Sequence, residues 1–279
     1  MKNSKNKSKK VNYAWLFDVD GVLTHLEEKR VTEKEIITEL IGKLKAGEPV
    51  ILNTGRALDF MDKKIVQPLG KALKDKTPLG NFLAVGEKGG VVMLFDSAGK
   101  KKFFIDKSIS VPPALGNEVR DLIRRQFSKT MFFDATKKTM ISAEMNDGLE
   151  IKKFRPEQKK LIRAMEKMLA RRGLARSYKI DPTISATDIE NKHAGKHLGV
   201  QRALSWLREK KIRPKQFIAF GDSRSDLAMA RELKKEGLKM EFVFVGKKEI
   251  LSGERLNFPV VYTKERYEAG VMEYFKSHR

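Results

Sequence analysis

The sequence predicts an α/β protein whose core is a doubly wound parallel sheet, interrupted by an inserted α+β domain. Over residues 11–87 and 188–279, short apolar runs alternate with segments of helical periodicity. Strand, helix and strand in repeated order is the pattern of parallel strands joined by helices. Residues 88–187 lack that alternation and contain paired strand-like runs with two amphipathic helices, which is typical of a separate α+β domain.

The first apolar run, which ends at Phe17, is continuous, as in a strand buried on both faces of a parallel sheet. After it, Thr32 and Glu35 have the spacing of a capping box, which predicts the start of a helix with one apolar face. The elements expected in this part are a strand ending at Phe17, a helix over 33–45, a strand over 49–53, a helix starting near Leu58 and a strand over 82–86.

The remaining elements follow from the same two periodicities. In the inserted segment we expect a hairpin over 91–105, a helix over 117–127, strands near 130–134 and 139–145, a helix over 157–172 and a strand over 176–188. After it we expect a helix over 197–210, a strand over 217–220, a helix near 227–233, strands over 242–245 and 259–262, and a terminal helix over 264–276.

The chain carries a net charge of +22, from 58 basic and 36 acidic residues, and contains no cysteine. The lack of cysteine excludes disulfides, thiolate catalysis and cysteine-ligated zinc. Residues 1–10 hold five lysines and no acid, which predicts a disordered basic tail. The other positive charges are spread along the chain and favour anionic partners in general. Without a signal sequence or a membrane-spanning run, we expect a cytoplasmic protein that is not associated with a membrane.

Polar side chains follow three of the predicted strands where each strand ends. Asp18 and Asp20 are two residues apart, so they point to the same side of an extended chain. Thr54 follows the second strand, and Asp222 and Asp226 follow the strand over 217–220. The carboxyl ends of parallel strands meet at one edge of the sheet, where open α/β sheets bind ligands. Carboxylates gathered there need a compensating cation, and Mg²⁺ with a phosphate group fits oxygen ligands.

In this order, the segments resemble the motifs of the haloacid dehalogenase superfamily of phosphotransferases. The matching residues are Asp18–Thr24 for the first motif, Thr54 for the second, Lys196 for the third and Gly221–Asp226 for the fourth. An insert between the second and third motifs, together with Thr54-Gly55-Arg56 and Gly86–Gly90, resembles the branch with an α/β cap. That branch includes sugar-phosphate phosphatases and phosphomannomutases. The resemblance implies a Rossmann-like core over 11–87 and 188–279 and a cap over 88–187.

The resemblance also implies a reaction and a role for each residue. The reaction is Mg²⁺-dependent hydrolysis of a phosphomonoester of a sugar or similar small metabolite through an aspartyl-phosphate, with the cap closing over the substrate. In it, Asp18 is the nucleophile and Asp20 the general acid and base. Asp18, Asp20 (through its backbone carbonyl) and Asp222 would bind the metal, Thr54, Gly55 and Lys196 the phosphoryl oxygens, and Asp226, Arg56 and Ser223 would support the site.

The position of the third motif leaves an alternative open. Counting back from Gly221 places its lysine at Val200, whereas counting forward from Asp188 places it at Lys196. We favour Lys196, with Lys192 as the alternative. Ser225 and Lys88 depart from the pattern of the branch, since asparagine is usual at the first position and asparagine or histidine at the second.

Two other functions are alternatives to the phosphatase. A phosphomutase of the same fold would return the phosphoryl group to its substrate. A nucleic-acid-binding protein would agree with the charge of +22. However, no stretch interleaves basic residues with aromatic ones, so we favour a small phosphorylated substrate over nucleic acid. The sequence leaves the oligomeric state and the substrate identity open.

Overall fold

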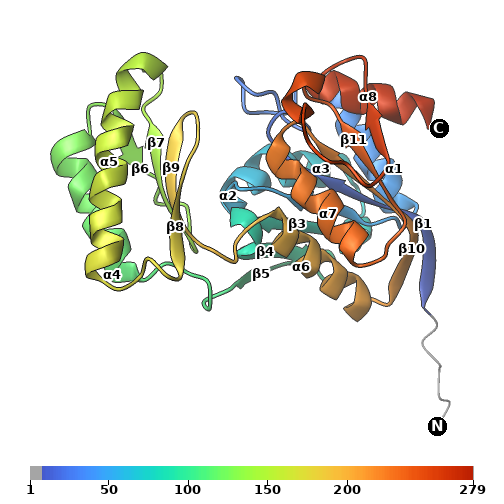
Figure 1. Ribbon diagram of the computed structural model, residues 1–279. Coiled ribbons are helices and arrows are strands. Elements are labelled where there is room, and N and C mark those ends of the chain that lie inside the picture. The colour runs from blue at the N-terminus through green and yellow to red at the C-terminus, as the bar shows by residue number, and fades with distance from the viewer. Residues whose placement is uncertain (1–7, 279) are drawn as a thin grey trace, which may run out of the picture. The chain divides into compact units, whose positions relative to one another are not determined.

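The computed structural model describes residues 8–278 and divides the chain into two compact units. The core unit contains the chain up to Phe104 and again from Gly195 onward, and the inserted unit contains Ile105–Ala194 (Figure 1). Among the helices of residues 8–278, none has the length and apolar character that crossing a bilayer requires.

The core unit is built on a sheet of eight strands in the order β12-β11-β10-β1-β2-β3-β4-β5. The strands are β1 (Lys9–Phe17), β2 (Val50–Asn53), β3 (Phe82–Gly86), β4 (Val91–Phe95), β5 (Lys101–Ile105), β10 (Ile212–Gly221), β11 (Met240–Phe244) and β12 (Val260–Tyr262). From β12 to β3 all neighbours pair in parallel, and β4 pairs with β3 in the antiparallel direction. The mostly parallel sheet confirms the predicted fold class.

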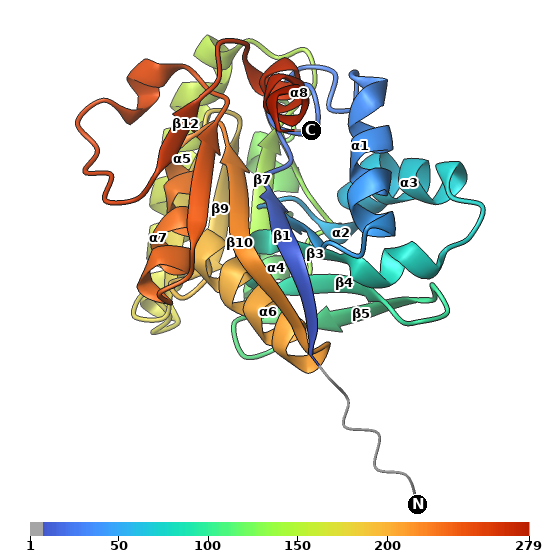
Figure 2. The same ribbon diagram turned by 90° about the vertical axis from the view of Figure 1, so that its right-hand side faces the viewer.

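Helices cover both faces of this sheet (Figure 2). On one face lie α1 (Lys34–Lys45), α2 (Leu58–Met61), α3 (Gln67–Ala72) and α8 (Tyr267–Ser277), and on the other α6 (Lys196–Glu209) and α7 (Leu227–Lys235). A π-helical segment, Asp62–Val66, joins α2 to α3. Trp15 and Phe17 of β1 pack on the first face, and Ala14 and Leu16 on the second. Because the strand is buried on both faces, its sequence is apolar throughout.

The inserted unit has a sheet of its own, antiparallel and ordered β6-β7-β9-β8. Its elements are α4 (Pro113–Leu122, continued by a π-helical segment to Phe127), β6 (Met131–Phe133), β7 (Ile141–Met145), α5 (Ile151–Arg171), β8 (Tyr178–Pro182) and β9 (Ala186–Asn191). Val119 of α4 and Leu161 and Met165 of α5 pack with Ile189 of the sheet in one core cluster. This unit agrees with the predicted α+β insert.

The borders between the units lie at 104/105 and 194/195, whereas the predicted borders were at 87/88 and 187/188. The hairpin over 91–105 was expected in the insert, but β4 and β5 extend the core sheet, because a single 3₁₀ turn, Glu87–Gly89, brings β4 back along β3. The predicted basic tail over residues 1–10 also changes. Lys9 and Lys10 lie in β1, opposite Ile212 and Arg213, and residues 1–7 lie outside the described residues.

Three helix and strand limits also differ from the sequence prediction. The expected capping box at Thr32 is wrong, because α1 has Glu33 as its N-cap and no side chain caps it. Instead, the carboxylate of Glu268 in α8 accepts hydrogen bonds from the N–H and hydroxyl of Thr32, at 2.8 and 2.7 Å. Helix α5 begins six residues earlier than expected and contains Pro156. The single strand expected over 176–188 is the pair β8 and β9.

Candidate active site

The carboxyl ends of β1 and β10 place two aspartates side by side. Phe17 and Phe220 are opposite one another in the parallel pair, and Asp18 and Asp222 follow shortly after them. The N–H of Asp18 donates to the carbonyl of Phe220 at 3.1 Å. The loop after β1 then passes so close that a Cβ on Gly21, which has φ +71°, would lie 2.5 Å from a carboxylate oxygen of Asp222. Only glycine combines this conformation with this approach.

Asp18, Asp222 and Asp226 form an acidic cluster in which one carboxylate oxygen of each lies within 4.8 Å of the others. Asp18 is 7% exposed and Asp226 is fully buried. Nζ of Lys196 lies 2.7 Å from Oδ1 of Asp18 and also forms an ion pair with Asp226. One ammonium group cannot neutralise three carboxylates. The possible metal ligands of the cluster are all carboxylate oxygens, and they need further positive charge. The residues present therefore fit Mg²⁺.

The pKa values of the cluster reflect this shortage of positive charge. Burial raises the pKa of Asp18 to about 8, against the lowering effect of Lys196 and with the support of Asp226 and Asp20. Burial and then the charge of Asp226 raise the pKa of Asp222 to about 7. Burial alone would lower the pKa of Lys196, but the charges of Asp18 and Asp226 outweigh it and raise that pKa. Both aspartates are therefore in surroundings that disfavour their charged forms.

Lys196 is the first residue of α6, and the structure shows what holds it there. The N–H of Gly195 donates to the carbonyl of Lys88 at 2.8 Å, and Nδ2 of Asn53 donates to the carbonyl of Lys196 at 2.7 Å. A Cβ on Gly199 would overlap the Asn53 side chain, so α6 approaches the end of β2 closely. Sequence reasoning missed Asn53, although a polar residue ending an apolar strand was a signal for it.

The alternatives for the third-motif lysine lie in other surroundings. Val200 is buried in the core between α6 and the sheet. Lys192 is exposed and belongs to the inserted unit. In the core unit, the structure thus brings Lys196 into contact with Asp18 and uses Val200 for packing.

The loop after β10 is ordered by Asp226. Its Oδ2 accepts hydrogen bonds from the N–H groups of Asp222 and Ser223, at 3.0 and 2.9 Å, and from the hydroxyl of Ser223 at 2.8 Å. Ser223 and Asp226 thereby form a capping box at the turn that leads into α7. The hydroxyl of Ser225 lies 2.9 Å from that of Ser223. Asp226 therefore links the orientation of Asp222 to the position of Lys196.

Asp20 is not a member of the acidic cluster, and its hydrogen-bond partner is Arg56. Its two carboxylate oxygens accept hydrogen bonds from Nε and Nη2 of Arg56, at 2.8 and 3.0 Å. The guanidinium of Arg56 also lies over the ring of Phe60, 4.7 Å from its centroid. This bidentate pair ties the loop after β1 to the loop after β2.

The loop after β2 contains Thr54, Gly55 and Arg56. Thr54 is buried, and its hydroxyl accepts the N–H of Arg56 at 3.2 Å. The 3₁₀ turn Glu87–Gly89 holds this loop, because the N–H of Lys88 donates to the carbonyl of Thr54 and the N–H of Glu87 to that of Arg56, both at 3.0 Å. Thr54, Asp18 and Asp222 therefore all follow the carboxyl ends of parallel strands of the core sheet.

No protein-family model and no curated protein matches this sequence. Solved structures match its fold. A haloacid dehalogenase-like hydrolase from Bacteroides thetaiotaomicron is 13% identical, with a TM-score of 0.63 over 98% of this chain and 100% of that one. The chain has the fold of haloacid dehalogenase-like hydrolases with a cap.

Two further matches to the haloacid dehalogenase-like fold are phosphatases. Trehalose-6-phosphate phosphatase from Aspergillus fumigatus is 16% identical, with a TM-score of 0.55 over 95% of this chain and 92% of that one. Sucrose-phosphatase from Synechocystis, solved in complex with sucrose and phosphate, is 12% identical, with a TM-score of 0.53 over 98% of each chain. At these identities the likeness concerns the fold.

Proposed function

We propose that this protein is a Mg²⁺-dependent phosphatase that hydrolyses a phosphomonoester of a sugar or a similar small metabolite. The observation that carries the proposal is the buried cluster at the ends of β1 and β10, in which Lys196 contacts Asp18 beside Asp222 and Asp226. A carboxylate nucleophile, a fixed cation and a set of metal-binding oxygens are the groups that phosphoryl transfer needs. The fold's likeness to trehalose-6-phosphate phosphatase and sucrose-phosphatase favours a sugar phosphate.

In the proposed reaction, a carboxylate oxygen of Asp18 attacks phosphorus. The bond to the leaving oxygen breaks, and an aspartyl-phosphate forms. Lys196, the Thr54 hydroxyl and the Gly55 N–H would bind the phosphoryl oxygens. Because phosphoryl transfer depends mainly on positioning and on stabilising charge, fixed groups of this kind account for most of the catalysis.

Asp20 would donate a proton to the leaving oxygen and later accept one from the water that hydrolyses the aspartyl-phosphate. In the structure both of its oxygens accept hydrogen bonds from Arg56. The proposal therefore requires that Arg56 release Asp20 when the substrate enters. A guanidinium matches a phosphate group as well as it matches a carboxylate, so the substrate itself can take over the contact.

Asp18, Asp222 and the backbone carbonyl of Asp20 would hold the metal. When bound, Mg²⁺ offsets the charge of the phosphoryl group and of the nucleophile. Asp226 and Ser223 would act by positioning, since their hydrogen bonds order the loop that carries Asp222.

The test is release of inorganic phosphate from p-nitrophenyl phosphate and from a panel of sugar phosphates, with Mg²⁺ and with EDTA. Asp18→Asn is the test variant, and Asp147→Asn, at an exposed position of the inserted unit, is its matched control. We expect Mg²⁺-dependent release by the wild type and the control only. Equal rates for the wild type and Asp18→Asn would refute the proposal. Analysis of the sugar products distinguishes hydrolysis from return of the phosphoryl group to the substrate.

A further inference from the structure

A groove with four basic side chains lies in the core unit, between α1 and the segment 62–72. It is open to solvent and has a volume of about 480 Å³. The basic residues that line it are Arg30 and Lys34 on one side and Lys63 and Lys64 on the other. None of the described residues that line it is acidic. We call this feature the basic groove.

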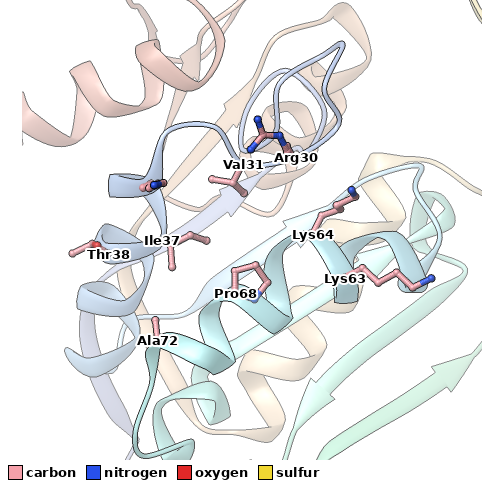
Figure 3. A pocket seen from close by; sticks show the side chains of 9 residues that line it. Arg30, Val31, Ile37, Thr38, Lys63, Lys64, Pro68 and Ala72 are labelled. Atoms are coloured by element: carbon pink, nitrogen blue, oxygen red, sulfur yellow. The ribbon is translucent and has the colours of Figure 1, made fainter. Parts of the chain in front are cut away.

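The basic groove has an apolar side chain on each of its two facing walls. Figure 3 shows Ile37 of α1 and Pro68 of α3 facing one another across it, with Arg30 and Lys64 toward one end and Ala72 at the other. Ile37 is partly buried against the core cluster, so it forms a firm wall. The groove therefore offers apolar contact between its walls and positive charge at its rim.

The positive charge of the groove is largely uncompensated. Within residues 8–278, the ammonium groups of Lys34, Lys63 and Lys64 form neither an ion pair nor a hydrogen bond, and Arg30 pairs with the exposed Glu28 at 2.5 Å.

A neighbouring groove beside α3 shows the contrast. There the ammonium of Lys76 donates to the carbonyl of Gly70, and Lys101 pairs with Asp62. Two of the three lysines that line the second groove, Lys76 and Lys101, thus have partners within the protein, and only Lys71 has none among the described residues. The three lysines of the basic groove are all available to a ligand.

We propose that the basic groove binds a small organic anion with an apolar body. A volume of about 480 Å³ is in the range of small-molecule sites. An anionic group at the rim would offset the lysine charges, and the apolar body would cover Ile37 and Pro68. No residue of the acidic cluster lines the groove, so this site is separate from the proposed phosphatase site and does not depend on it.

The probe for the test is 1-anilinonaphthalene-8-sulfonate, a stable aromatic anion that a phosphatase cannot hydrolyse, titrated by fluorescence. Its uncharged counterpart is N-phenyl-1-naphthylamine. The test variant is Lys63→Gln/Lys64→Gln, and Lys63→Arg/Lys64→Arg retains the charge. Lys45→Gln/Lys74→Gln is the matched control, because these exposed lysines of the same unit do not line the groove.

We expect the anion to bind the test variant about five- to tenfold more weakly than the wild type, because two charge contacts are lost. The arginine variant and the matched control should bind as the wild type does. Binding to the wild type should also weaken as salt is raised, since the rim is exposed. Circular dichroism melting confirms that each variant is folded.

Equal binding of the anion to the test variant and the wild type would overturn the proposal. So would binding of the uncharged probe to the wild type with the same affinity as the anion. The two proposals of function are distinguished by Asp18→Asn and by inorganic phosphate. Asp18→Asn should bind the probe as the wild type does, and at constant ionic strength inorganic phosphate should displace the probe no more than chloride does. The test variant should hydrolyse p-nitrophenyl phosphate at the wild-type rate, so loss of one property leaves the other measurable.

Discussion

The two sheets of this protein differ in strand direction, and the difference decides where each can gather polar side chains. In the core unit β1, β2 and β10 run parallel, so Asp18, Thr54 and Asp222, which follow their carboxyl ends, belong to one edge. In the inserted unit neighbouring strands run in opposite directions, so successive strand ends alternate between two edges. In the parallel part of the core sheet, the ends of neighbouring strands therefore all lie at one edge, although the strands are distant in sequence.

Buried polar groups follow the same division. In the inserted unit several of them are paired with one another or with the backbone: the Ser142 hydroxyl donates to Asp188 at 2.6 Å, and Nε2 of Gln158 donates to the carbonyls of Thr183 and Ala186 at 3.1 and 2.8 Å. The buried hydroxyl of Thr187 is an exception, without a hydrogen-bond partner among the described residues. At the edge of the core sheet, three carboxylates share one lysine. Paired groups stabilise a fold, whereas undercompensated charge is available for chemistry. Substitutions in the two regions should therefore affect different properties.

The largest effect is expected for Asp18→Asn. If Asp18 is the nucleophile, kcat for p-nitrophenyl phosphate should fall at least about 10³-fold. The melting temperature should stay the same or rise, because burial and the neighbouring carboxylates disfavour a charged group at this position and asparagine is always neutral. Steady-state kinetics and thermal melting measure both. A folded variant that retains its activity would break the comparison, because the acidic edge would then be structural.

Lys196→Met should lower both activity and stability. Loss of a fixed cation at the transition state should reduce kcat about 10²–10³-fold. Removing one partner from a buried ion pair should also cost about 3 kcal/mol in free energy of unfolding. The matched control is Lys192→Met, at the exposed lysine that the sequence left as the alternative. Steady-state kinetics and urea unfolding of both variants decide between Lys196 and Lys192 as the lysine of the third motif. Equal losses of activity and stability in the two variants would contradict the assignment of Lys196.

Gln158→Leu should lower stability without affecting the chemical step. The substitution removes the two hydrogen bonds that Nε2 donates to carbonyls of the inserted unit, at a total cost of about 1–3 kcal/mol in free energy of unfolding. Each carbonyl keeps another donor, the N–H of Thr183 for Ala186 and Nη1 of Arg155 for Thr183. The value of kcat for p-nitrophenyl phosphate should change less than about twofold. Gln126→Leu, at an exposed position of the same unit, serves as the control. A large loss of kcat with unchanged stability would show that the division between the regions fails.

The smallest effect is expected for Tyr274→Phe. The hydroxyl of Tyr274 is a buried polar group of the core unit, and like Ser142 of the inserted unit it donates a hydrogen bond to a carboxylate, that of Glu241. Burial and the hydrogen bond to Glu241 raise the pKa of Tyr274 above its usual value near 10. The neutral phenol is thus favoured in the folded state, so its contribution to stability is full below about pH 10 and declines as the pH rises above it.

The variant should lose about 1 kcal/mol near neutral pH, from the missing hydrogen bond. Its stability should then fall less steeply than that of the wild type between about pH 10 and 11. Urea unfolding at several pH values measures the difference between the two proteins. Identical slopes would show that the phenol is not held in its neutral form.

Much of the fold could be predicted because its signals are local. A continuous apolar run such as Ala14–Phe17 specifies a strand buried on both faces, and a change of periodicity marks the insert. Polar residues directly after such strands, Asp18 and Asp222 among them, could be named as a group because parallel strand ends share an edge. Their chemical roles remain proposals.

The tertiary structure decided which distant residues meet. The hairpin of β4 and β5 has the same local pattern whichever sheet it joins, and only its pairing with β3 assigns it to the core unit. The N-terminus of α1 is bonded by Glu268, 236 residues away from Thr32, where the local pattern had suggested Glu35. The contact of Arg56 with Asp20, and of Lys196 with Asp18, likewise depends on strand order and loop geometry. Periodicity describes which face of an element is apolar, but the neighbours of a side chain are set by packing between elements that the chain reaches by different paths.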